Sequence, residues 1–123
     1  MSAWLDAAHI DPAVQALRPD YRALLVLAEG LASGPSDLAS DGLLVAAEER
    51  ARARLDGSPP DLHPLVAAWR DAFRAFGAKP QRTRSSVEAL LRRVPEGLPR
   101  IDKLTDAYNA VSVSHLLPLG GED

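Results

Sequence analysis

The clearest hydrophobic pattern of the chain lies between residues 62 and 76. Apolar side chains recur there at steps of four, three, four and three residues: Leu62, Val66, Trp69, Phe73 and Phe76. This spacing places side chains on one face of an α-helix. Pro64 suits a first helical turn, and Gly77 suits the residue just after the helix. The pattern predicts a helix over 63–76 that starts at His63 and turns its aromatic side chains to the core.

Two more segments carry helical patterns. A helix is predicted over 37–55, capped by Ser36 or Ser40, and its solvent side is expected to hold Glu48 and Arg52 as an i,i+4 ion pair. A second helix is predicted over 86–94. Ser85 and Glu88 have the spacing of a capping box. The side chains expected to face inward on this helix are Val87, Leu90, Leu91 and Val94.

A fourth helix is predicted over 101–114, and it carries two stripes. The apolar stripe, expected to be buried, consists of Ile101, Leu104, Tyr108 and Val111. The polar strip consists of Asp106, Asn109 and Ser112, which recur every three residues. Three interpretations of the polar strip stay open. It can line a pocket, it can be solvent-exposed helix surface, or Asp106 can be buried and hydrogen-bonded for a structural reason.

The run of uncharged residues from 23 to 28 predicts the one strand of the chain. Ala23–Glu29 is short and apolar, and Pro19 and Gly30 bound it, as is typical of a strand buried on both faces. Residues 1–20 are expected to be irregular or to contain a short helix between Pro12 and Pro19. With one strand and four helices in a single domain of 123 residues, the predicted fold class is α+β with helices dominant.

Composition and charge limit the classes of protein to which the chain can belong. The chain has no Cys, which excludes disulfides and thiolate metal sites, and no uncharged run long enough to span a membrane. A cytoplasmic location is therefore expected. The net charge of -3 conceals a basic segment, because residues 70–103 carry nine Lys or Arg and four Asp or Glu. Such a segment indicates either a polyanionic partner or a solvated helix face.

Motifs for chemistry are missing from the sequence. There is no phosphate-binding glycine loop, no zinc-protease motif and no nucleophile elbow, and His9, His63 and His115 are too scattered for a metal set. Neither a metal nor a cofactor is expected.

From His63 onward, about half of the chain follows a specific order of motifs. A Trp is followed by Gly-x-Lys-Pro, a basic Ser-Ser turn, Leu-Leu-Arg-Arg, Leu-Pro-Arg-Ile, Asp-x-x-Asn and Pro-x-Gly-Gly-Glu-Asp. These motifs occupy Trp69, Gly77–Pro80, Arg84–Ser86, Leu90–Arg93, Leu98–Ile101, Asp106–Asn109 and Pro118–Asp123. In this order they resemble the B3/B4 domain of the phenylalanyl-tRNA synthetase β subunit, and free-standing proteins made of that domain.

The resemblance implies a helix-rich fragment of the B3/B4 domain with few strands, and recognition of tRNA or aminoacyl-tRNA. In the synthetase this domain removes tyrosine wrongly attached to the phenylalanine tRNA, and it does so by positioning water at the ester. The pocket candidates are then Asp106, Asn109, Ser112, Gly120 and Gly121. The candidates for binding nucleic acid are Lys79, Arg82, Arg84, Arg92, Arg93 and Arg100.

Two departures from the family pattern favour binding over hydrolysis. Where the synthetase pattern has a histidine, this chain has Gly120, although Asn109 and Asp123 match. The family also continues past this point with strands that complete its sheet, so the chain is expected to be a partial copy that can self-associate through an incomplete sheet edge. The function predicted first is tRNA binding. The alternatives are a hydrolase that deacylates misacylated tRNA and a helical interaction protein whose basic face is incidental.

Overall fold

The structure, a computed structural model, describes residues 2–122, and its regular elements in this range are helices alone. Asp123, which matches the last position of the family pattern, lies outside the described residues. The chain divides between Ala32 and Ser33 into two units. The predicted α+β class is wrong, because the described residues form no strand and no sheet. The sheet edge expected as a self-association site is therefore not part of the described structure.

The first unit contains two short helices, α1 (Ser2–Ala7) and α2 (Pro12–Leu17). The predicted strand at Ala23–Glu29 is a segment without regular structure, and Leu24 in its middle is 89% exposed. A strand needs a neighbouring strand to satisfy its backbone N–H and C=O groups. Among the described residues no such neighbour exists, and so the apolar run alone does not make a strand.

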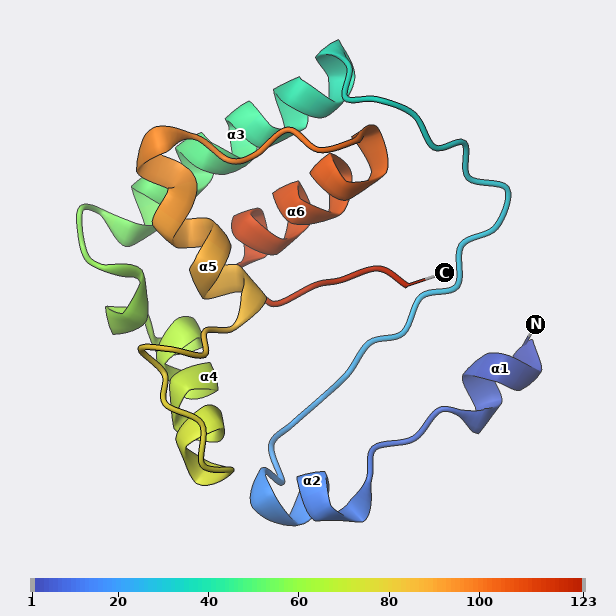
Figure 1. Ribbon diagram of the computed structural model, residues 1–123, viewed down its shortest axis with the longest axis vertical. Helices are drawn as coiled ribbons and strands as arrows, with labels where there is room; N and C mark the ends of the chain where they lie inside the picture. Colours follow the sequence, from blue (N-terminus) through green and yellow to red (C-terminus); the bar gives the residue numbers. More distant parts are fainter. Residues whose placement is uncertain (1, 123) are drawn as a thin grey trace. The chain divides into compact units, whose positions relative to one another are not determined.

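The second unit contains the helices that the hydrophobic pattern predicts. They are α3 (Leu38–Leu55), α4 (Pro64–Ala75), α5 (Ser86–Arg93) and α6 (Lys103–His115), with 3₁₀ turns η1 (Pro60–Leu62) and η2 (Val94–Glu96). Figure 1 shows these elements in the colours of the chain. The four predicted helices are confirmed, and each of their ends lies within two residues of the predicted one.

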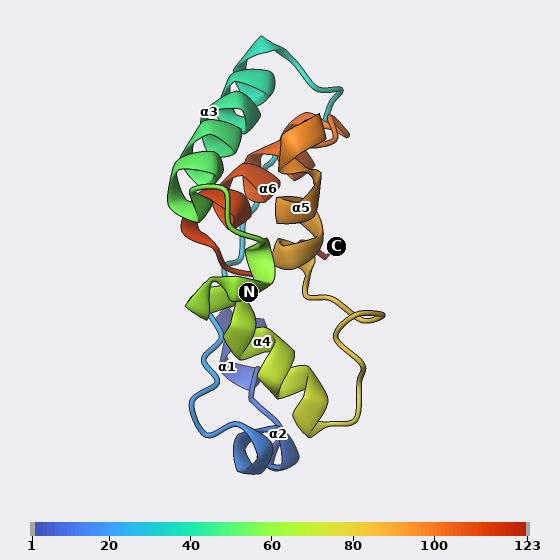
Figure 2. The same ribbon diagram turned by 90° about the vertical axis from the view of Figure 1, so that its left-hand side faces the viewer.

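Helices α3 and α6 lie side by side and run in the same direction (Figures 1 and 2). At their N-terminal ends the Lys103 amide donates to the Gly34 carbonyl over 3.1 Å, and at their C-terminal ends Arg54 donates to the Ser114 carbonyl over 3.0 Å. Small side chains such as Ala47 and Ala110 are buried in the hydrophobic core that the two helices share with α5. The other members of this core are Leu44, Ala51, Val66, Val87, Leu91, Val94, Leu98, Val113 and Leu116.

The N-terminus of α3 is capped by a residue that the sequence analysis overlooked. Asp37 is the N-cap: its carboxylate accepts from the Ser40 amide at 2.8 Å, and the Ser40 hydroxyl accepts from the Asp37 amide at 2.9 Å. This is a reciprocal capping box. Ser36, the other predicted cap, instead donates its hydroxyl to the carboxylate of Asp106 in α6. The residue that precedes the N-cap of α3 is therefore joined directly to the first turn of α6.

Helix α6 buries the face opposite to the one predicted. The predicted apolar stripe is largely in solvent, with Ile101 57% exposed and Val111 also exposed. The buried face carries the polar strip together with Ala110 and Val113. Short side chains on this face allow α6 to lie close to α3, and the side chains of Asp106 and Ser112 are hydrogen-bonded within the protein. Close packing with satisfied polar groups is a stable alternative to burying the larger apolar side chains.

Helix α4 is confirmed as an amphipathic helix with the predicted ends. The His63 imidazole accepts from the Leu65 amide and caps the N-terminus. Gly77 has a φ of +87°, and the Ala78 amide returns to the Phe73 carbonyl, as in a glycine-terminated helix. Its apolar stripe is only partly buried: Val66 and Ala72 are buried, Trp69 and Phe73 are half-buried, and Leu62 and Phe76 are exposed.

Candidate nucleic-acid interface

The loop between α4 and α5 holds two of the predicted phosphate-binding residues in a tight turn. The Lys79 carbonyl accepts from the amides of Arg82 and Thr83, at 2.9 and 2.8 Å. Pro80 is buried and anchors the turn, while the side chains of Lys79 and Arg82 are exposed. The loop therefore exposes two cationic side chains, and the hydrogen bonds of the turn and the buried Pro80 hold its backbone in place.

Glu88, in α5, is the centre of an ion-pair cluster that the sequence analysis did not foresee. The predicted capping box forms only in part: the Ser85 hydroxyl accepts from the Glu88 amide at 3.4 Å, but the Glu88 carboxylate does not return to Ser85. The carboxylate is fully buried and accepts two bonds from Arg70 in α4, at 2.9 and 2.7 Å. Arg92 donates to it at 2.9 Å, and Arg84 lies 3.5 Å from it.

Asp61 in η1 adds a second carboxylate to this cluster. It lies 3.1 Å from Arg92 and 3.9 Å from Arg70. The hydrogen bonds from Arg70 and then Arg92 hold the pKa of Glu88 below its ordinary value, against the effect of burial. The cluster ties η1, α4 and α5 together through ionised groups. The four-residue spacing of Arg84, Glu88 and Arg92 is the feature of the sequence that could have indicated these ion pairs.

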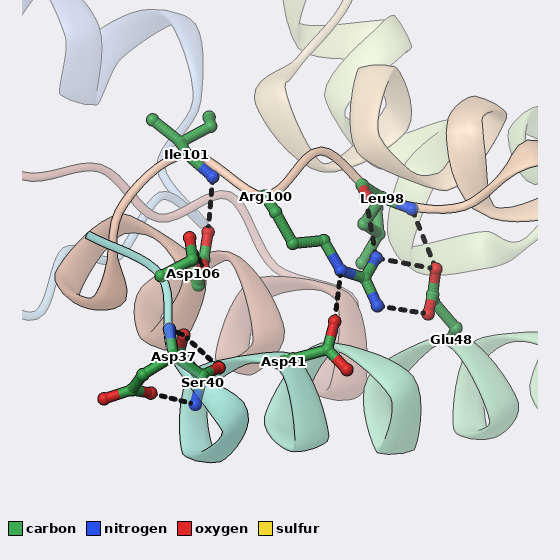
Figure 3. A network of polar contacts seen from close by, with 9 residues as sticks. Asp37, Ser40, Asp41, Glu48, Leu98, Arg100, Ile101 and Asp106 are labelled. Atoms are coloured by element: carbon green, nitrogen blue, oxygen red, sulfur yellow. Dashed lines mark hydrogen bonds and ion pairs between the residues drawn. The ribbon is translucent and has the colours of Figure 1, made fainter.

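Arg100 belongs to a separate network on α3 (Figure 3). Its guanidinium lies 2.8 Å from Asp41 and 3.3 Å from Glu48. Glu48 also accepts from the buried Leu98 amide at 2.8 Å. The prediction that Glu48 pairs with Arg52 in solvent is wrong, because Glu48 is buried. Burial raises the pKa of Glu48, but the bonds from Arg100 and Leu98 outweigh it and lower that pKa overall.

The polar strip of α6 is an internal structural feature. Asp106 is completely buried and accepts from the Ile101 amide at 2.8 Å (Figure 3). It also accepts from the Ser36 hydroxyl. Ser112 is buried and donates to the Leu117 carbonyl at 2.6 Å, and Asn109 is buried as well. Of the three open interpretations, the structural one describes Asp106: its carboxylate fixes the turn before α6.

The remaining pocket candidates lie in the C-terminal tail. Gly120 has open space around it, and a Cβ at Gly121 would come within 3.3 Å of the Tyr108 ring. Asp106, Asn109 and Ser112 are buried in α6, whereas Gly120 and Gly121 are exposed in the tail. A shallow, open depression lies elsewhere, lined by Arg54, Leu55, Ser58, Leu62, His63 and Pro64.

The three buried carboxylates predict how stability depends on pH. The pKa values of Glu48, Glu88 and Asp106 are all lowered, from ordinary values of 4.5, 4.5 and 3.8. The unfolded chain therefore binds these protons more tightly, so the free energy of unfolding is at its full value above about pH 5 and falls as the pH drops below it. Urea unfolding between pH 7 and pH 3 measures this effect. Glu88→Gln should show a smaller loss over the same range, and equal losses would contradict the assignment.

A second expectation concerns ester hydrolysis. We expect the chain to release no tyrosine from mischarged phenylalanine tRNA above the buffer blank, because Asp106, Asn109 and Ser112 are buried rather than open to an ester. The assay follows free tyrosine with time. Release that Asn109→Ala abolishes, in a variant shown to be folded, would contradict this expectation.

The predicted nucleic-acid residues fall into two groups. Arg84, Arg92 and Arg100 are held by carboxylates, whereas Lys79, Arg82 and Arg93 are exposed and make no ion pair within residues 2–122.

Among the described residues no group of His, Asp and Glu side chains is arranged to hold a metal ion, and no helix is long and apolar enough to cross a membrane. Comparison with protein-family models, curated proteins and solved structures gives no match for the chain.

Proposed function

We propose that the chain binds RNA through a basic surface, defined here as the exposed basic side chains of the 79–84 loop and of the C-terminal turn of α5. The observation that carries the proposal is the gathering of unpaired cations in this part of the sequence. Lys79, Arg82 and Arg93 are exposed, and within the described residues no carboxylate lies within ion-pair distance of them. Exposed cations without internal partners are available to neutralise phosphates, the main source of affinity in RNA binding.

Arg100 is left out of the proposed surface. Two carboxylates hold its guanidinium, and a third bond goes to the Leu98 carbonyl at 2.8 Å. This network contains one cation and two anions, so a phosphate at this position would meet a net negative charge. The basic surface is therefore concentrated on the segment from residue 79 to residue 93.

The proposed ligand is tRNA, and the proposed activity is binding without chemistry. The choice of tRNA rests on the resemblance of residues 63–123 to the B3/B4 domain, whose motifs include the Lys-Pro loop and the Leu-Leu-Arg-Arg helix. The basic surface supports this choice because exposed cations are suited to contact a sugar–phosphate backbone. Such contacts position an RNA without reading its bases.

The test is a binding titration of the full chain against fluorescently labelled, unacylated tRNA over a series of salt concentrations. With three to five phosphate contacts, the logarithm of the association constant should fall with the logarithm of salt with a slope of about -2 to -4. Single-stranded DNA of the same length is the control and should bind more weakly. The absence of binding at low salt, or binding that salt does not weaken, would contradict the proposal.

A further inference from the structure

The side chains of Arg84 and Arg92 meet at a single carboxylate oxygen. The Nε atom of Arg84 lies 3.5 Å from Oε2 of Glu88, and the Nε atom of Arg92 lies 2.9 Å from the same atom. Since both Nε atoms are within 3.5 Å of one oxygen, they can be no farther apart than twice that distance. Two guanidinium groups at this spacing are close enough to bind the same phosphate, whose oxygens accept from several donors at once.

Both arginines are also open to solvent. The side chain of Arg84 is 41% exposed and that of Arg92 is 33% exposed, whereas the Glu88 carboxylate beneath them is fully buried. A guanidinium has five N–H donors. Arg84 engages the carboxylate through Nε, and Arg92 engages carboxylates through Nε and Nη2. Each therefore keeps N–H donors for a ligand.

The cluster carries more positive than negative charge. Arg70, Arg84 and Arg92 contribute three cations, and Asp61 and Glu88 contribute two anions. Arg70 is the most enclosed of the three cations and is bonded through two nitrogens to Glu88. The net positive charge of the cluster therefore lies on the exposed side chains of Arg84 and Arg92, and the negative charge of one phosphate would neutralise it.

We infer that Arg84 and Arg92 together bind one backbone phosphate of the RNA, and that Glu88 is the residue that positions both. The inference rests on the proposed RNA binding. It adds a preformed contact to the unpaired cations at Lys79, Arg82 and Arg93. Because Glu88 holds the two guanidinium groups before the ligand arrives, less side-chain freedom is lost on binding.

The first experiment compares two variants that each remove one negative charge, at Glu88 and at Glu49. Glu88→Gln removes a negative charge, which by long-range attraction alone should tighten binding to tRNA. If Glu88 positions the arginines, binding instead becomes about tenfold weaker and the salt slope becomes shallower, because two guanidinium groups lose their fixed place at the phosphate. Glu49→Gln makes the same charge change at an exposed position of α3 and should leave binding equal or slightly tighter. Equal effects of the two variants would overturn the inference.

If Glu88→Gln does not fold, a second measurement on the unmodified chain tests whether Arg84 and Arg92 contact the RNA. The ¹⁵Nε signals of Arg84 and Arg92 are followed by NMR while unacylated tRNA is added. Movement of both signals together, saturating with the binding curve, supports the shared phosphate contact. If the tRNA binds and these two signals stay in place, the inference fails and the proposed function stands. If no tRNA binds, both fail.

Discussion

Glu48→Ala is expected to lower the free energy of unfolding by about 3 kcal/mol, a large part of the stability of a small domain. The substitution removes the acceptor of the buried Leu98 amide and leaves Arg100 with Asp41 as its remaining carboxylate partner. An unsatisfied buried amide costs about 1–3 kcal/mol, and the separated charge adds to this. The effect stays near the lower end of the range for buried ion pairs, because Arg100 is 30% exposed and water can reach it.

Urea unfolding at pH 7, followed by circular dichroism, measures this change. The matched control is Glu49→Ala, which removes the neighbouring but exposed glutamate of the same helix. It should change the free energy of unfolding by less than about 0.5 kcal/mol. Similar losses in the two variants would mean that Glu48 acts through helix propensity or net charge rather than through Leu98 and Arg100.

The second large effect concerns RNA binding. Replacing Lys79, Arg82 and Arg93 together by Gln should weaken tRNA binding roughly a hundredfold at physiological salt, because each phosphate contact contributes about 0.7 to 0.9 to the salt slope. The slope itself should become shallower by about 2 to 3. Different tRNAs should be affected alike, since contacts to phosphate carry no sequence information. Labelled-tRNA titrations over a salt series give both quantities.

The control variant neutralises Arg22, Arg50 and Arg54, which lie outside the basic surface and give the same change in net charge. It should weaken binding by a much smaller factor and leave the salt slope nearly unchanged. Two results would contradict the proposed surface: equal weakening by both triple variants, or a changed preference among tRNAs with an unchanged slope.

Local periodicity predicted the helices but not the partners of their polar residues. The apolar stripe from Leu62 to Phe76 and the apolar positions of α5 were enough to predict two helices. Helical spacing can be recognised from residues that are close together in the sequence. The partner of Glu48 is 52 residues away, and no local pattern identifies it. The ion pairs of Glu88 could have been predicted from the sequence, since Arg84 and Arg92 lie four residues before and after it.

Two of the wrong predictions share one physical cause. The stripe of Ile101 and Val111 and the run Ala23–Glu29 were expected to be buried because they are apolar. Hydrophobicity makes burial favourable but does not supply the surface that covers a residue. In α6 the hydrogen bonds of Asp106 and the close approach of short side chains decide which face turns inward. In the 23–29 segment the described chain offers no strand to pair with.

The parallel arrangement of α3 and α6 has a consequence for how the chain reaches its native state. Two adjacent helices that run in the same direction cannot be joined by a short turn, so η1, α4, α5 and η2 all lie between them in the sequence. The bond from Ser36 to Asp106 joins residues 70 positions apart. Contacts of such high sequence separation require an entropically costly loop closure before they contribute, and they slow folding. We therefore expect this helical body to fold more slowly than an antiparallel bundle of equal length.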